Sequence, residues 1–165
     1  MTRATSQDLG VIDNSWQIVG VGDFNGDAKA DILWRNANGD TVIDNSNPSG
    51  GFVSQDLGVI DNSWQIAGVG DFNGDAKADI LWRNTDGDTV IDYSNASGGF
   101  VSRDLGVIDN SWQIAGVGDF NGDAKADILW RNTDGDTVID YSNASGGFVN
   151  HDVGVVGTSW VIQKG

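Results

Sequence analysis

The chain has 165 residues, among them 24 aspartates and no glutamate, and its formal net charge is −15. Such an acidic protein repels nucleic acid and anionic membrane surfaces, which argues against nucleic-acid binding and leaves cations as its natural counter-charge. Seven Trp, six Phe and 24 Gly, with one Pro and no Cys, favour an all-β fold and exclude a disulfide framework.

An internal repeat dominates the sequence. SQDLGVIDNSWQI begins at Ser6 and recurs at Ser54, and SRDLGVIDNSWQI begins at Ser102, a constant offset of 48 residues. The complete repeats are residues 6–53, 54–101 and 102–149; a partial fourth repeat, residues 150–165, completes a single repeat domain over residues 1–165. Units of about this length are typical of proteins that bury their apolar faces against neighbouring copies.

Four strands are predicted in each repeat. Residues 16–24 are apolar or Gly on both faces, so we expect them to form the innermost strand. Residues 31–36 follow, and Asn38-Gly39 is a favoured two-residue hairpin turn into the strand at residues 40–44. Residues 52–60 alternate with more polar side chains, which suits the outer edge.

This order of strands, apolar inside and polar outside, predicts β-propeller-type blades of four antiparallel strands, about three blades per chain. A β-trefoil, which also contains three four-stranded units, stays open as the alternative. The tryptophans recur at two positions of the repeat, and we expect them to fill the space between adjacent blades: Trp16, Trp34, Trp64, Trp82, Trp112, Trp130 and Trp160.

The two ends of the chain match incomplete blades. Residues 6–12 correspond to a fourth strand with no blade before it, and residues 159–163 correspond to a first strand with no blade after it. Unpaired strand edges invite pairing with another copy. We therefore expect a homo-oligomer in which self-association completes the ring.

An acidic loop, DFNGDAKAD, lies between the first two strands of each repeat. Oxygen-bearing side chains stand at loop positions one, three, five and nine, and the backbone carbonyl of the lysine at position seven can add a ligand. A tight turn would gather these oxygens as a hard cation requires, and the carboxylates would repel one another without it. An Asp-rich hairpin without bound metal is the alternative.

The segment GVGDFNGDAKADILWRN resembles the FG-GAP or VCBS repeat of bacterial secreted proteins and integrin α-subunit propellers. The resemblance covers all three repeats and implies a β-propeller, an extracellular location, Ca²⁺ in the loop, and roles in adhesion, recognition or presentation of larger assemblies; this chain itself begins without a signal peptide. The corresponding ligands, with the carbonyl of the lysine included, are Asp23, Asn25, Asp27, Lys29 and Asp31; Asp71, Asn73, Asp75, Lys77 and Asp79; and Asp119, Asn121, Asp123, Lys125 and Asp127.

One loop position departs from the family pattern. The family usually has Gly at the sixth position, where this chain has Ala28, Ala76 and Ala124. If the sixth position needs a left-handed conformation, a Cβ costs about 1–2 kcal/mol. Calcium binding is then expected to be weak.

The residue inventory argues against an enzyme. The chain contains no GxxxxGKS/T, HExxH or GxSxG motif and only one histidine, His151, on a polar outer strand. We expect a non-catalytic calcium-binding propeller module for protein interaction, adhesion or scaffolding, without membrane insertion. A multivalent lectin is the alternative, in which repeated pockets with exposed aromatics such as Tyr93 and Tyr141 bind glycans. A third hypothesis, an enzyme fragment, would depend on His151.

Overall fold

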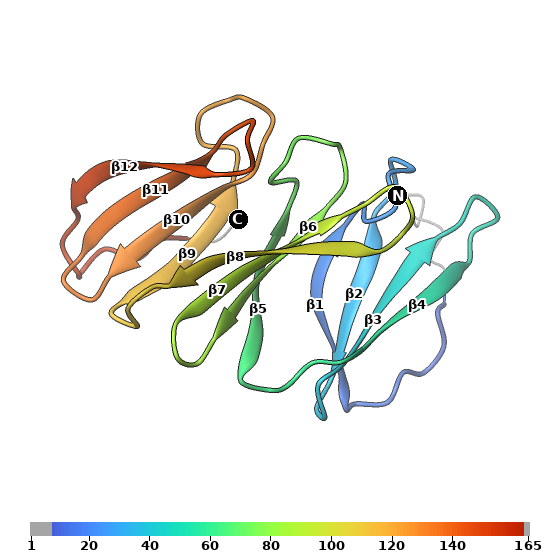
Figure 1. Cartoon of the computed structure of the whole chain (residues 1–165). Helices are drawn as coiled ribbons and strands as arrows, with labels where there is room; N and C mark the ends of the chain where they lie inside the picture. The colour runs from blue at the N-terminus through green and yellow to red at the C-terminus, as the bar shows by residue number, and fades with distance from the viewer. Residues whose placement is uncertain (1–7, 164–165) are drawn as a thin grey trace, which may run out of the picture.

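The computed structural model describes residues 8–163, which form twelve strands and no helix (Figure 1). The strands pair into three antiparallel sheets of four, and each sheet keeps the order of the chain. Blade 1 comprises β1 (Trp16–Gly22), β2 (Asp31–Asn36), β3 (Asp40–Ser46) and β4 (Phe52–Val59). Blade 2 comprises β5 (Trp64–Gly70), β6 (Asp79–Asn84), β7 (Asp88–Ser94) and β8 (Phe100–Val107). Blade 3 comprises β9 (Trp112–Gly118), β10 (Asp127–Asn132), β11 (Asp136–Ser142) and β12 (Phe148–Val155).

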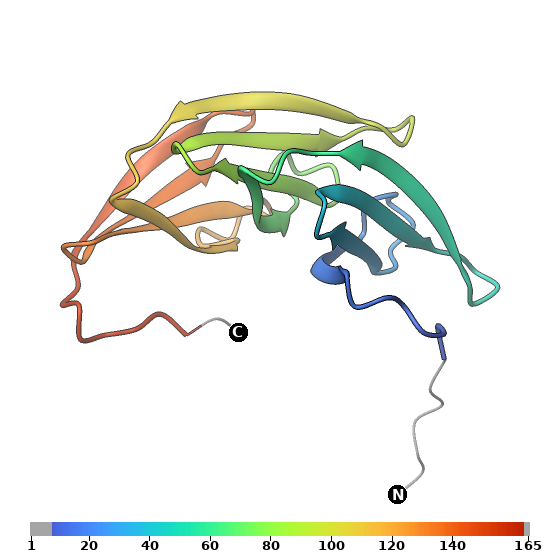
Figure 2. The same cartoon turned by 90° about the horizontal axis from the view of Figure 1, so that it is seen from below.

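The three sheets are blades of the propeller type, which confirms the predicted fold class. They lie side by side along an arc (Figure 2), and the inner strand of each blade contacts the inner strand of the next, β1 against β5 and β5 against β9. The trefoil alternative is wrong because the twelve strands form three separate sheets. No helix in the described part of the chain is long and apolar enough to cross a membrane.

The predicted strand positions are confirmed to within a few residues, but the turn between the second and third strands differs. This connection spans residues 37–39, three residues rather than two. The amide of Gly39 donates a 2.9 Å hydrogen bond to the carbonyl of Asn36, and Gly39 has a φ of 94°. A type I turn followed by a left-handed Gly is the usual geometry of a three-residue hairpin loop.

The core lies between blades rather than within them. The first cluster joins three side chains of blade 1 to three of blade 2: Phe24, Leu33 and Ile43 against Ala78, Ile80 and Trp82. The second cluster repeats it one blade further on: Phe72, Leu81 and Ile91 against Ala126, Ile128 and Trp130. Each blade therefore has a forward face, bearing Phe, Leu and Ile toward the next blade, and a backward face, bearing Ala, Ile and Trp toward the preceding one.

The inner strand of blade 1 is less buried than its composition suggests. Ile18 and Val21 of β1 are more than half exposed, whereas Leu33 of β2 and Ile43 of β3 are fully buried. Leu33 and Ile43 pack against blade 2, whereas no preceding blade covers Ile18 and Val21; their equivalents in blades 2 and 3 are partly buried.

The interblade role of tryptophan is confirmed for Trp82 and Trp130, which are buried in the two clusters. It is wrong for Trp160, which is 72% exposed, because no following sheet covers it.

Neither end of the chain forms the strand that its sequence matches. Residues 8–15 and 156–163 contain no strand, since neither segment has a neighbouring strand to complete a hydrogen-bonded ladder. Ser6 and Gln7 of the predicted N-terminal strand lie outside the described residues, as do Lys164 and Gly165 of the partial repeat.

Candidate functional site

The acidic loops fold around their own aspartates. In blade 2, Asp71 Oδ1 accepts hydrogen bonds from the amides of Gly74 and Asp75 at 2.6 and 3.1 Å, and Asp71 Oδ2 accepts one from Ala76 at 2.8 Å. Asn73 Oδ1 accepts a hydrogen bond from the amide of Asp75 at 2.9 Å. The loops of blades 1 and 3 repeat this pattern. The side chains at positions one and three therefore stabilise the turn by binding its backbone amides.

The ninth loop position has a different environment. Asp79 is fully buried; its Oδ2 accepts a 2.8 Å hydrogen bond from the amide of Phe72 and its Oδ1 a 3.0 Å bond from the amide of Ser94. Burial raises the pKa of Asp79 to about 7, and the nearby carboxylates of Asp75 and Asp71 act in the same direction, although the two amide bonds oppose the shift. Asp31 and Asp127 make the same pair of amide bonds in the other blades. The ninth residue thus clamps the loop to the third strand.

Successive loops contact each other at the blade boundary. The amide of Ala78 donates a 2.6 Å hydrogen bond to the carbonyl of Asp23, and the amide of Ala126 donates a 2.7 Å bond to the carbonyl of Asp71. The stem of Lys77 lies against Gly26, where a Cβ would come within 3.2 Å of Lys77 Cε. The three loops therefore form one continuous row of exposed acidic turns.

The backbone is left-handed at the sixth loop position, where the family pattern usually has Gly. Ala28, Ala76 and Ala124 have φ values of 65°, 66° and 66°, and they are the non-Gly residues with positive φ in the described chain. A Cβ in this region costs about 1–2 kcal/mol. Each loop therefore carries a local strain that a glycine would relieve.

The loop residues carry the donor atoms that calcium prefers, because carboxylate, amide and carbonyl oxygens are its usual ligands. Within residues 8–163, however, no group of three or more His, Cys or Asp side chains is arranged to hold a metal ion. The structure keeps positions one, three, five and seven in one exposed turn. The ninth residue, Asp31, Asp79 or Asp127, is buried beside this turn, and its two oxygens accept hydrogen bonds from backbone amides.

Charge compensation within the loop is weak. Asp75 Oδ2 lies 3.9 Å from Lys77 Nζ, and the matching distances are 3.8 Å in blade 1 and 3.4 Å in blade 3. A surface ion pair of this kind contributes about 0–1 kcal/mol. One lysine therefore offsets only part of the negative charge of the three loop aspartates, which is the condition that favours a bound cation.

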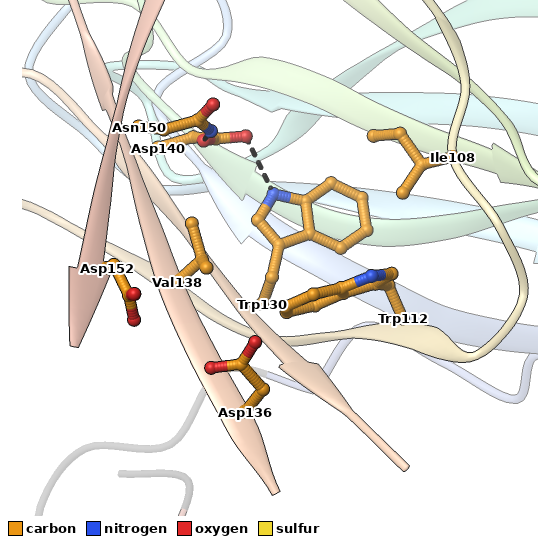
Figure 3. A pocket seen from close by; sticks show the side chains of 8 residues that line it. All are labelled: Ile108, Trp112, Trp130, Asp136, Val138, Asp140, Asn150 and Asp152. Carbon is orange, nitrogen blue, oxygen red and sulfur yellow. Dashed lines mark hydrogen bonds between the residues drawn. The ribbon is translucent and has the colours of Figure 1, made fainter. Parts of the chain in front are cut away.

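A second repeated site, which the sequence analysis did not identify, is a pocket lined by two tryptophans and an aspartate. In blade 3 the pocket has a volume of about 340 Å³, and Ile108, Trp112 and Val138 form apolar walls (Figure 3). Trp130 Nε1 donates a 2.9 Å hydrogen bond to Asp140 Oδ2, and Asn150 donates another to Asp140 (Figure 3). Burial raises the pKa of Asp140 above its ordinary value.

These indole pockets recur once per blade at the spacing of the repeat. The pockets of blades 1 and 2 measure about 190 Å³ each, and their residues are Ile12, Trp16, Trp34, Val42, Asp44 and Ser54 in blade 1, and Ile60, Trp64, Trp82, Val90, Asp92 and Ser102 in blade 2. The indole-to-carboxylate bond is conserved in both, at 3.0 and 2.9 Å. The signal in the sequence is the recurring pair of Trp and Asp ten residues apart, which the hairpin brings together on one face.

Tyr93 and Tyr141, expected to be exposed, are half-buried. Tyr93 packs against the second core cluster, and the Tyr141 ring lies 5.6 Å from that of His151. They do not line the indole pockets.

Family comparison agrees with the repeated loops and blades. A family model for an FG-GAP-like repeat matches residues 23–82 and 71–130, and a model for an FG-GAP repeat matches residues 111–152. The chain belongs to the FG-GAP repeat family. The first two FG-GAP matches begin at Asp23 and Asp71, the first residues of their acidic loops. A comparison with curated proteins finds no match.

Proposed function

We propose that this FG-GAP repeat protein is a non-catalytic, extracellular module for protein interaction, adhesion or scaffolding, and that its acidic loops bind Ca²⁺. The observation that supports the calcium part is the row of three exposed loops with identical polar residues and one lysine each. Loop positions one, three and five and the position-seven carbonyl hold the cation. The buried ninth residue braces the turn.

Calcium has a structural role in this proposal. A bound cation offsets the repulsion among the loop carboxylates and rigidifies turns that contact one another across the blade boundaries. It therefore stabilises the array by ligand linkage, by an amount that grows with the calcium concentration.

The test is thermal unfolding with and without calcium. We expect millimolar Ca²⁺ to raise the melting temperature relative to EDTA, and Mg²⁺ at equal ionic strength to raise it less, because Mg²⁺ dehydrates reluctantly. The Asp75→Asn variant should weaken binding in its loop about tenfold, since calcium affinity follows the charge count of the ligands.

The matched control is Asp86→Asn. It removes the same charge from the hairpin turn of the same blade, at a position where repeat 1 has Asn38, and Asn38 makes the same turn hydrogen bond as Asp86. A melting temperature that does not respond to calcium would refute the metal site. Equal losses of affinity in the two variants would indicate diffuse charge screening instead.

A multivalent lectin is the second candidate, and the three indole pockets favour it. The apolar C–H face of a sugar stacks on indole rings, and its hydroxyls hydrogen-bond to carboxylate and amide groups such as those of Asp140 and Asn150. Three equivalent weak sites gain avidity for a multivalent glycan.

A glycan array followed by titration of tryptophan fluorescence tests the lectin function. Replacing Trp112 by Phe should weaken binding in the blade 3 pocket, whereas replacing the exposed Trp160 by Phe should leave binding unchanged. A folded protein that binds no glycan on the array would exclude this candidate.

A further inference from the structure

The two outer faces of the three-blade array are the two halves of an interface that already occurs twice inside the chain. We propose that a second copy of the chain joins them head to tail, with the forward face of blade 3 packed on the backward face of blade 1 of the next copy. The inference depends on the packing of the blades. Neither calcium nor a sugar is needed for it.

The forward face of blade 3 is uncovered where its counterparts are buried. Phe24 and Phe72 are 4% and 0% exposed, but the equivalent Phe120 is 44% exposed. Leu129 is half-buried, whereas the equivalent Leu33 and Leu81 are fully buried. The apolar side chains of this face therefore lack the neighbour that the other two blades have.

The backward face of blade 1 shows the complementary deficit. Trp82 is buried and the equivalent Trp34 is half-buried, and Ala30 is exposed where Ala78 is buried. Val21 is 56% exposed, whereas its equivalents are partly buried against the preceding blade. Each outer face thus exposes the residues that the matching inner face buries.

Specific contacts define how the two copies would dock. Inside the chain, Arg35 Cζ lies 5.4 Å from the ring centroid of Trp82, and Arg83 Cζ lies 5.1 Å from that of Trp130. Head-to-tail docking places Arg131 over Trp34 of the second copy. It also places the carbonyl of Asp119 opposite the amide of Ala30 of the second copy. Inside the chain, the equivalent carbonyls of Asp23 and Asp71 accept hydrogen bonds from the amides of Ala78 and Ala126.

Glycines of the inner strands show how closely the copies would approach. A Cβ at Gly20 would lie 2.6 Å from Val69 Cγ2, and one at Gly68 would lie 2.5 Å from Val117 Cγ2. A Cβ at Gly116 meets no atom within 4 Å. The residue that docking brings against Gly116 is Val21 of the second copy.

The C-terminal segment occupies part of the docking site. Arg35 and Arg83 donate hydrogen bonds to the connection that enters the next blade, including the carbonyls of Trp64 and Trp112. Arg131 makes the equivalent bonds to Val156, Gly157 and Trp160. Residues 12–16 of an incoming copy must therefore replace residues 156–160, and the association is an exchange of one segment for another.

Sedimentation equilibrium of the full chain between about 1 and 100 μM tests the proposal, with the expected dissociation constant in this range. We expect concentration-dependent oligomers that are favoured by salt, because two surfaces of a chain with net charge −15 repel at low ionic strength. The Val21→Asp variant should weaken association about 100-fold or more, because it places an unpaired carboxylate in the apolar interface.

The matched control is Val101→Asp, which adds the same charge at an equally exposed valine of the outer strand β8; the equivalent Val53 and Val149 are 61% and 58% exposed, so a neighbouring blade does not cover this position. Gly116→Ala is the second test variant; its methyl group has free space in one copy and should also weaken association. A wild-type chain that stays monomeric throughout would overturn the proposal. Equal oligomerisation of Val21→Asp, Gly116→Ala and Val101→Asp would overturn it as well.

Discussion

The guanidinium of Arg35 in blade 1 stacks over the indole ring of Trp82 in blade 2, with Cζ 5.4 Å from the ring centroid. The same guanidinium donates hydrogen bonds to the carbonyls of Ile60 and Trp64, at 2.9 and 3.1 Å. One side chain thereby joins the second strand of a blade to the connection, the first strand and the second strand of the next blade. The contacts of Arg83 with blade 3 repeat this arrangement.

Replacing Arg83 by Ala should lower the free energy of unfolding by about 2–4 kcal/mol, because it removes charged hydrogen bonds and a cation–π contact and leaves two carbonyls unpaired. Arg83→Lys should recover only part of this, since an ammonium lacks the planar fork that reaches several acceptors. Urea unfolding measures both. The control, Arg103→Ala on the exposed surface, should change stability by less than about 0.5 kcal/mol.

Replacing Ala76 by Gly should stabilise the protein by about 0.5–1 kcal/mol, because relief of the left-handed Cβ exceeds the added chain entropy of glycine. Ala96→Gly is the matched control at a loop position without positive φ, where the same change should cost stability. Chemical unfolding in EDTA isolates the backbone effect from metal binding. A loss of stability at both sites would contradict the strain assigned to Ala76.

Replacing Gly68 by Ala should destabilise the junction of blades 2 and 3 by about 1–3 kcal/mol, since the new methyl group would lie 2.5 Å from Val117 Cγ2. Gly116→Ala makes the identical change in the identical repeat position, but with free space around the methyl group. At low protein concentration it should leave the melting temperature nearly unchanged. Similar losses in the two variants would show that strand propensity, and not the blade contact, sets the cost.

The pKa of Asp79, raised to about 7 mainly by burial, predicts that stability in calcium-free buffer depends on pH. The folded-state pKa lies above the unfolded value of 3.8, so the folded state binds the extra proton. The stability contributed by this proton is fully present below pH 3.8 and is lost as the pH rises through about 7. Urea unfolding at pH 5 and pH 8 measures the change.

Carboxyl NMR assigns that pH dependence to a residue. The Asp79 carboxyl should titrate near pH 7, whereas the exposed Asp61, whose pKa is lowered by hydrogen bonds from Ser63, should titrate below 3.8. An Asp79 carboxyl that titrates with the exposed aspartates would contradict the predicted burial effect.

Sequence reasoning predicted the blades because repetition and strand alternation are local signals. The constant offset from Ser6 to Ser54 gave the unit, and the Gly of Asn38-Gly39 marked the hairpin. The sequence also indicated backbone strain at Ala28, because the family usually has Gly at this position and Gly readily adopts the left-handed conformation.

The remaining features depend on contacts between repeats or on loop geometry. Nothing near Arg35 in the sequence points to Trp64 or Trp82, because the curvature of the array brings them together. The indole pockets were missed for a similar reason, since Trp34 meets Asp44 only through the register of β2 and β3. The hydrogen bonds that Asp31 accepts from the amides of Phe24 and Ser46 were missed as well, because they depend on its burial between the loop and β3.

The unlike faces of each blade give the array a direction. Every added unit must present its Trp side to the Phe side before it, so growth follows one polarity and one fixed rotation per step. Such a heterologous contact ends in a closed ring only when the rotations add up to a full circle, and otherwise continues as a helical fibre. The angle between neighbouring blades, which depends on contacts as close as that of the Gly68 backbone with Val117, therefore decides whether assembly is finite.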